Sequence, residues 1–248
     1  MDPVYVRFRK LARQIVSAHP TPRFYTECGR AVAASVNFYA TDPVVARLRR
    51  FVAARLNDDF GHGMTHAVKV TLDAGALMLV ESGNPPPAFA ALAHRVRHAQ
   101  CAGLLHDILR RAPDHAAAGA AFARRLLGGY PLPPAAVNDI CRAIQDHEAF
   151  KDFSPPRGAE TRMLGACLYD ADKFRWGPDN FTDTIWRMLS CARIPPEAFI
   201  HRFPRGMESL VSIRDTFRTP AGRRYGPQFI DLGLAIGWEL YDQIRHEG

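Results

Sequence analysis

Long apolar runs are missing from this chain of 248 residues, and their absence limits the classes of protein to which it can belong. No stretch of about eighteen apolar residues occurs, so the sequence predicts no transmembrane helix and no membrane partner. The first residues lack the charged-then-apolar order of a secretory signal peptide. Hydrophobic residues still make up 47% of the chain, which is ordinary for a globular protein. We expect one large domain, or a domain with an appendage.

Cysteine is scarce, and its five copies are scattered and odd in number. Cys101, Cys141 and Cys167 have apolar neighbours, which is typical of buried thiols rather than of disulfides. This use of cysteine favours a reducing compartment, so we expect a cytoplasmic protein.

Acidic residues are outnumbered, with 25 of them against 32 basic residues, a net charge of +7 and an isoelectric point near 9.4. That balance permits nucleic-acid binding. The basic residues, however, form only short clusters, such as residues 47–50 and 223–224, and no aromatic RNA-binding signature accompanies them. A solvated cationic surface, which also attracts small phosphorylated molecules, is therefore favoured over a nucleic-acid partner. Nothing in the sequence distinguishes a monomer from an oligomer.

The alternation of apolar and polar residues that is typical of strands does not persist, and the apolar residues mostly recur at helical spacing. Thr41, Asp42 and Pro43 predict a helix start, because a capping side chain precedes a proline in the first turn. Helices are also expected at residues 4–18, 64–80, 88–109, 116–127, 133–147, 163–174 and 225–244, with a mixed segment at 180–218 and loops at 57–61, 82–87 and 151–158. The fold class is therefore all-α, divided into an N-terminal helical extension (residues 1–40) and a domain of residues 41–248.

A histidine and an aspartate, His106 and Asp107, adjoin at the end of the apolar residues 101–105. Burying such a pair costs roughly several kcal/mol unless a partner compensates. A divalent metal is one such partner, because it accepts a neutral imidazole and a carboxylate in the same coordination shell. The alternative is a pair solvated at a helix end, and we favour the metal.

The ordered set His66, His106, Asp107 and Asp172 resembles the HD superfamily of metal-dependent phosphohydrolases. Residues 103–108 are similar to the central motif of that family, and residues 170–174 to its closing motif. The resemblance spans about residues 57–176. It implies an all-α, HD-domain-like helical bundle in which these four residues hold a metal.

Two of the four predicted ligands have a residue of the same type close by in the sequence that is a rival candidate. His66 is preferred over His62 because the basic-then-apolar residues that follow it are family-like, and His62 is more simply a helix-start or pocket residue. Asp172 is preferred over Asp170 because a basic and an apolar residue follow it, as in the family. Asp170 then either orients a ligand or is a solvated carboxylate.

Two further histidines, His115 and His147, resemble the additional ligands of dinuclear HD sites. The alternative for His115 is an exposed residue at a helix start, and we weigh the two interpretations equally. For His147 a ligand is favoured over a polar residue at a helix end. Imidazole and carboxylate ligands suit Mn, Fe, Co, Ni and Zn, so we expect one or two ions of a divalent transition metal.

Basic residues near the closing motif are candidates for holding a substrate phosphate, since positive charge there neutralises the phosphoryl oxygens. Lys173 is the preferred one, and Arg175 and Lys151 are more simply solvated. His94 and His98 are expected on an ordinary helix surface or in the core, and the tryptophans, including Trp176, in the core.

The resemblance implies hydrolysis of a nucleotide or another small phosphate ester by a metal-activated water, with Asp107 and Lys173 as catalytic residues and Asp107 placed to bridge two ions. Three alternatives stay open. They are a di-iron HD-type oxygenase, a non-catalytic regulatory or nucleic-acid-binding HD module, and a metal site that is only structural.

Overall fold

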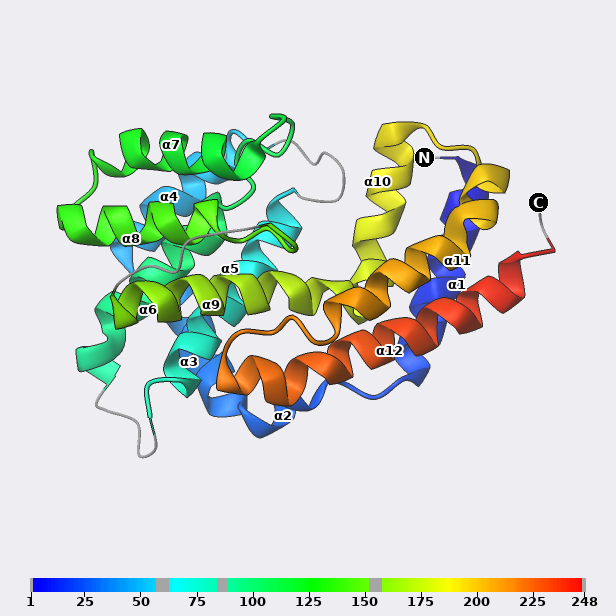
Figure 1. The fold of residues 1–248 in the computed structure, drawn as a ribbon, viewed down its shortest axis with the longest axis horizontal. Coiled ribbons are helices and arrows are strands. Elements are labelled where there is room, and N and C mark those ends of the chain that lie inside the picture. The colour runs from blue at the N-terminus through cyan, green and yellow to red at the C-terminus, as the bar shows by residue number, and fades with distance from the viewer. Residues whose placement is uncertain (1, 57–62, 84–88, 152–157, 247–248) are drawn as a thin grey trace.

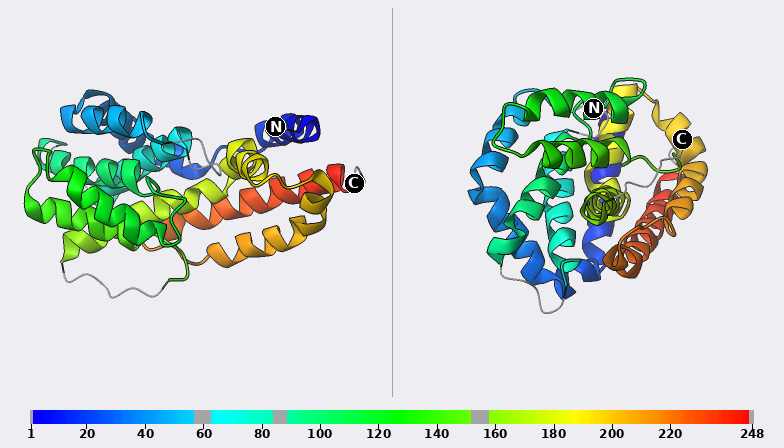
Figure 2. Two further views of the ribbon diagram at one scale, coloured as in Figure 1. Left: turned by 90° about the horizontal axis from the view of Figure 1, so that it is seen from above. Right: turned by 60° about the vertical axis from the view of Figure 1, so that its left-hand side comes forward.

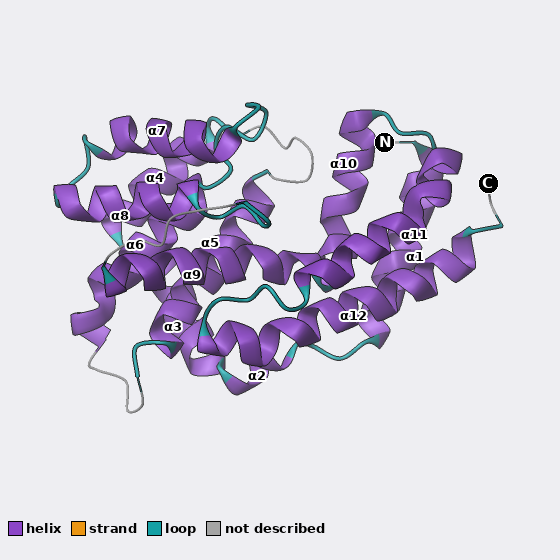
Figure 3. Ribbon diagram, in the orientation of Figure 1, coloured by secondary structure: helices purple, strands orange, loops and turns teal. Residues whose placement is uncertain are grey.

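A computed structural model describes residues 2–56, 63–83, 89–151 and 158–246, and the regular structure in these ranges is helical (Figure 3). No strand occurs in those ranges, so the predicted all-α class is confirmed. His62 and most of the loops predicted at residues 57–61, 82–87 and 151–158 lie outside the described residues. Among the described helices, none combines the length and the apolar character needed to cross a membrane.

The helices in chain order are α1 (Pro3–Ala18), α2 (Arg23–Glu27), α3 (Gly29–Thr41), α4 (Pro43–Ala53), α5 (Met64–Val80), α6 (Phe89–Leu105), α7 (His115–Leu127), α8 (Pro134–Gln145), α9 (Ala159–Lys173), the 3-10 turn η2 (Phe174–Trp176), the π-helix η3 (Asn180–Thr184), α10 (Ile185–Ala192), α11 (Pro196–Ile213) and α12 (Pro220–Ile244). The segment 180–218, predicted as mixed, is thus largely helical. The predicted start of α4 is confirmed, because the Asp42 side chain accepts hydrogen bonds from the backbone N–H groups of Val44 and Val45.

Two helices end earlier than predicted, and in both cases a histidine lies just beyond the end. α6 stops at Leu105 instead of residue 109, and α8 stops at Gln145 instead of residue 147. The ring Nδ1 of His106 is 2.8 Å from the carbonyl oxygen of Gly103, three residues back. The ring of His147 makes the same contact with Ile144. A side chain that binds a terminal carbonyl satisfies it without another helical turn.

The first hydrophobic core lies around α5, which packs against α3, α6 and α9, while α8 packs on α6, α7 and α9 (Figure 1). α5 is buried on most of its faces, as expected for an apolar helix at the centre of a bundle. A Cβ atom at Gly103 would lie 2.6 Å from the Cα of Thr71. Glycine therefore lets α6 approach α5 closely, three residues before His106.

A second core is formed by α1, η3, α10, α11 and the C-terminal part of α12. α11 and α12 pack together, and both views of Figure 2 show them side by side, with the two chain ends near this part of the molecule. Within residues 1–40, α1 belongs to this second core, whereas Phe24 and Phe38 belong to the first. The proposed boundary at residue 40 stays a prediction.

Ion pairs connect the two cores. Lys69 of α5 lies 2.5 Å from Asp179, just before η3, and Arg9 of α1 lies 2.6 Å from Asp183 within η3. The π-helix is therefore held from both sides, which fixes α10 relative to the helices of the first core. All five cysteines are free thiols, and Cys101, Cys141 and Cys167 are buried as predicted.

Candidate metal centre

The crossing of α5 and α6 brings His66 and His106 together, with their Nε2 atoms 3.2 Å apart. His66 lies in the first turn of α5, and His106 directly follows α6. Because a carbonyl oxygen only accepts, the Nδ1 of His106 that contacts Gly103 carries the proton. The lone pair of His106 Nε2 therefore faces the site, in the form in which imidazole binds a metal.

Two carboxylates complete this group. Asp172 Oδ1 lies 3.2 Å from His66 Nε2 and 3.7 Å from His106 Nε2, and Asp107 Oδ2 lies 3.9 and 3.4 Å from the same two atoms. Ligands about 2.1 Å from one ion are separated by roughly 3.0–3.4 Å in tetrahedral or octahedral geometry. The four side chains, which we call the first ligand group, are buried and spaced to close on a single cation with small adjustments.

A second ligand group shares Asp107. Its Oδ1 atom lies 3.4 Å from His115 Nε2 and 3.5 Å from His147 Nε2. The contact of His147 Nδ1 with the carbonyl oxygen of Ile144 fixes its Nε2 as the lone-pair nitrogen, as for His106. The two oxygens of Asp107 thus face two different groups of predicted ligands, and this carboxylate would bridge two ions if each group held one. All six predicted ligands are brought together in one buried cluster.

Arg110 distinguishes the second group from the first. Its guanidinium donates a hydrogen bond of 2.7 Å to His115 Nε2 and lies 3.6 Å from Asp107 Oδ1. Arginine stays charged in proteins, so its proton occupies the imidazole lone pair that a metal would use. Sequence reasoning missed Arg110, although its position three residues after Asp107 was a usable signal.

Opposite charges keep the carboxylates of the cluster ionised. Burial alone would raise the pKa of Asp172, but Lys173, His66 and His106 hold it well below its usual range. His106 and His147 likewise lower the pKa of Asp107 against the effect of burial. Ionised carboxylates are the form that binds a cation.

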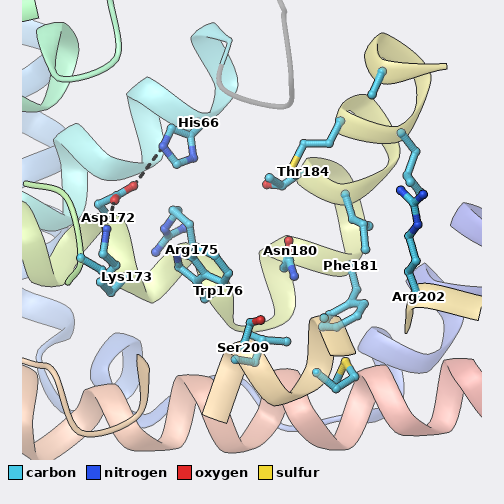
Figure 4. Close-up of a pocket in the computed structure, with 18 of the residues that line it drawn as sticks. His66, Asp172, Lys173, Arg175, Trp176, Asn180, Phe181, Thr184, Arg202 and Ser209 are labelled. Carbon is cyan, nitrogen blue, oxygen red and sulfur yellow. Dashed lines mark hydrogen bonds and ion pairs between the residues drawn. The ribbon is translucent and has the colours of Figure 1, made fainter. Parts of the chain in front are cut away.

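Lys173 lies in the wall of the site rather than in solvent. Its Nζ atom donates to Asp172 Oδ2 at 2.6 Å (Figure 4) and to the carbonyl oxygen of His147 at 3.3 Å. One oxygen of Asp172 is therefore held by Lys173, and the other faces His66 and His106. The structure places Lys173 where it orients a ligand and adds positive charge beside the site.

Asp170 has a different role from either predicted one. It is fully buried, so the interpretation as a solvated carboxylate is wrong. Its two oxygens each accept a backbone hydrogen bond of 2.8 Å, from Arg218 and Thr219, which precede α12. Burial is the main cause that raises its pKa to about 6. Asp170 anchors α12 to α9, while Asp172, two residues on, faces the ligands.

Arg175 is also not the solvated residue that the sequence suggested. It is 4% exposed and forms ion pairs with Asp73 and Asp179, and its guanidinium donates to the hydroxyl of Tyr25. Lys151, by contrast, is exposed and lies outside the pocket lining.

The prediction for His94, His98 and the tryptophans is confirmed in part. His94 and His98 pack against each other on α6, outside the pocket lining. Trp186 is a core residue as expected, but Trp176 and Trp238 are 37% and 42% exposed, which contradicts the prediction for them.

A pocket of about 700 Å³ opens directly from the ligands. His66, Asp107, His147, Asp172 and Lys173 form one end, and apolar side chains of α10 and α11 form much of the other, as Figure 4 shows in part. We call these the metal end and the apolar end. No sequence motif marks the apolar end, and its predicted secondary structure was the least definite of the chain.

A buried His/Asp cluster on an all-helical scaffold defines a class of metal-binding helical bundles. Residues 63–177 match the family model described as HD domain, and they include all six predicted ligands. This match is consistent with an HD superfamily protein, and HD domains bind divalent metals and are typically metal-dependent hydrolases. No curated protein and no solved structure matches the chain.

Proposed function

We propose that this protein is a metal-dependent phosphohydrolase that cleaves a small phosphate ester. The observation that carries the proposal is Asp107, whose two oxygens face two groups of buried ligands at the end of an open pocket. A bound divalent metal supplies an activated water and polarises the phosphoryl oxygens. A nucleotide is one candidate ester, on the strength of the family resemblance.

The residues of the chain have separate tasks in this proposal. His66, His106, Asp107 and Asp172 hold the ion, and the backbone carbonyl of Gly103 fixes the orientation of His106. Lys173 holds Asp172 in place and offers positive charge toward the phosphate. Arg110, which lines the same pocket, offers a second positive group once a phosphate draws it from His115.

The first ligand group is the principal ion site in our proposal. Lys173 occupies one oxygen of Asp172 and leaves the other toward His66, whereas in the second group the Arg110 guanidinium lies on His115 Nε2 itself. A second ion has to displace this positive charge, so it binds more weakly. We therefore expect one tightly bound ion per chain and a second one at higher metal concentration.

The test is elemental analysis of the purified protein together with a phosphate-release assay on a panel of esters. We expect one or more equivalents of Mn, Fe, Co, Ni or Zn and metal-dependent phosphate release. Asp107→Ala should lose both. Asp231→Ala, which removes an exposed carboxylate of α12, is the matched control and should keep both.

Other outcomes distinguish the alternatives. Two irons and an oxygen-dependent product would replace the hydrolase with an oxygenase. Absence of metal even after incubation with Mn or Ni, with salt-sensitive binding of DNA or RNA, would favour the regulatory module.

A further inference from the structure

The apolar end of the pocket has no role in holding a metal or a phosphate, yet it provides much of the pocket wall. We infer that the substrate is a phosphate monoester whose alcohol part is a bulky apolar group, an alkyl or aryl chain that extends from the metal end between α10 and α11. This inference rests on the proposed function and names its substrate class.

The size of the pocket is the first argument. A volume of about 700 Å³ is that of a site for a whole small molecule, far more than a phosphate group fills. Because the phosphate is fixed at the ligands, the remaining space has to take the rest of the ester. That space leads to the second core, where the wall consists of α10 and α11.

The chemistry of the wall is the second argument. Met188, Leu189, Phe199, Phe203 and Met207 line the apolar end, and methionine adapts well to apolar ligands of varied shape. The polar groups there are Asn180, Thr184 and Ser209, with Arg202 at an exposed position of α11. Arg175 also lines the pocket, but Asp73 and Asp179 pair with its guanidinium. This wall is mainly a surface for apolar contact, whereas reading a base needs several convergent donors and acceptors.

Exposure at the rim is the third argument. Trp176 and Met188 both line the pocket, and they are 37% and 41% exposed. Large apolar side chains that face solvent together around a concave site mark a surface that an apolar ligand covers.

Gly206 of α11 provides a steric test of the inference. It lines the pocket, and a Cβ atom built there meets no heavy atom within 4 Å. A larger side chain at this position would therefore enter the pocket space without a clash in the helix packing. Gly29 of α3 is a matched control, because its Cβ direction is equally open and it lies outside the pocket lining.

The experiment measures phosphate release and calorimetric binding for ethyl, butyl, hexyl and octyl phosphate and for nucleoside monophosphates, with the metal-loaded protein. We expect kcat/KM and affinity to rise about threefold per added methylene group. Gly206→Leu should lower the ratio of octyl to ethyl phosphate at least about tenfold in both readouts, and Gly29→Leu should leave that ratio unchanged. Met188→Glu, at a partly exposed position that tolerates a charge, should lower it too.

The two readouts separate failure of the inference from failure of the proposed function. Equal affinity for ethyl and octyl phosphate, or a preference for nucleoside monophosphates, would overturn the apolar alcohol part. Tighter binding of octyl phosphate that Gly206→Leu abolishes, without phosphate release from any ester, would uphold the inference and reject the hydrolase.

Discussion

The two ends of the pocket are built in different ways. At the metal end, six side chains converge on distances of 3.2–3.9 Å, and the rings of His106 and His147 are oriented by backbone carbonyls. At the apolar end, ordinary core residues of α10 and α11 leave a space between them. Catalytic chemistry is therefore concentrated in a few residue types, whereas the shape of a substrate pocket depends on many residues.

Asp172 and Asp170 are the two candidates for the last carboxylate of the metal end, and substitution of each one distinguishes them. Asp172→Asn should lower turnover at least about a thousandfold and remove the tightly bound ion, because it takes a charged ligand from the first group. Asp170→Asn should keep the ion and lose stability instead, since the described hydrogen bonds of Asp170 run to Arg218 and Thr219 before α12. Metal content, turnover and urea unfolding distinguish the two variants. Loss of metal from Asp170→Asn alone would reverse the assignment.

The next effect concerns the segment that links the two ends. Arg175→Leu leaves the buried Asp73 without its guanidinium partner, and removing one member of a buried ion pair costs about 3–5 kcal/mol. We expect that loss in the free energy of unfolding, measured with urea. Arg214→Leu, which breaks an exposed pair with Asp231, should change it little. An equally small loss of unfolding free energy in Arg175→Leu would mean that the ion pairs of Arg175 with Asp73 and Asp179 do not hold the two ends together.

The sequence predicted the metal end far better than the apolar end, and the reason is physical. His106 and Asp107 are costly to bury, so their position after an apolar segment already indicated a partner. α5 was predicted with its bounds because an apolar helix between breakers is a local signal. Met188 and Gly206, by contrast, are unremarkable in a helix, and only the packing of α10 and α11 against the first core places them around a space.

Arg175 and Arg110 show a second limit of sequence reasoning. Arginine is usually a surface residue, so Arg175 was expected in solvent. Its burial depends on Asp73, about a hundred positions away in the chain, which no local pattern connects to it. Which partner a charged side chain finds is decided by the tertiary structure.

Within the metal end, Arg110 makes the second ligand group differ from the first. Arg110→Met keeps much of the side-chain length and removes the charge, so His115 Nε2 becomes available to a second ion. We expect the affinity for a second Mn²⁺ to rise about 10–100-fold in calorimetric titration, the range typical of changes around metal ligands. Arg111→Met, at the exposed neighbouring position, is the matched control. An unchanged second binding step would show that Arg110 does not limit the number of ions.

Low pH can destabilise the protein through a histidine of the helical scaffold, His98, or through the histidines of the ligand cluster. Burial is the main cause that lowers the pKa of His98 to about 4, with a further contribution from its neighbours, and the charged groups near it are His94, Arg97, Asp139 and Glu160. Between pH 6.5 and 4 the folded protein then holds fewer protons at this ring than the unfolded chain. Its contribution to stability is present above pH 6.5 and is lost as the pH falls through that window.

His98→Gln should remove this loss while leaving the ligand histidines unchanged. We measure the free energy of unfolding at pH 7 and pH 5 in the presence of a chelator. Its fall between these pH values should be about 1 kcal/mol smaller in the variant than in the wild type, because partial exposure of His98 screens the full effect of its pKa shift. His94→Gln, at an exposed position one turn away, should keep the steeper fall. If His98→Gln is as acid-sensitive as the wild type, acid acts through the ligand cluster, and the metal end rather than the scaffold sets the pH range of the fold.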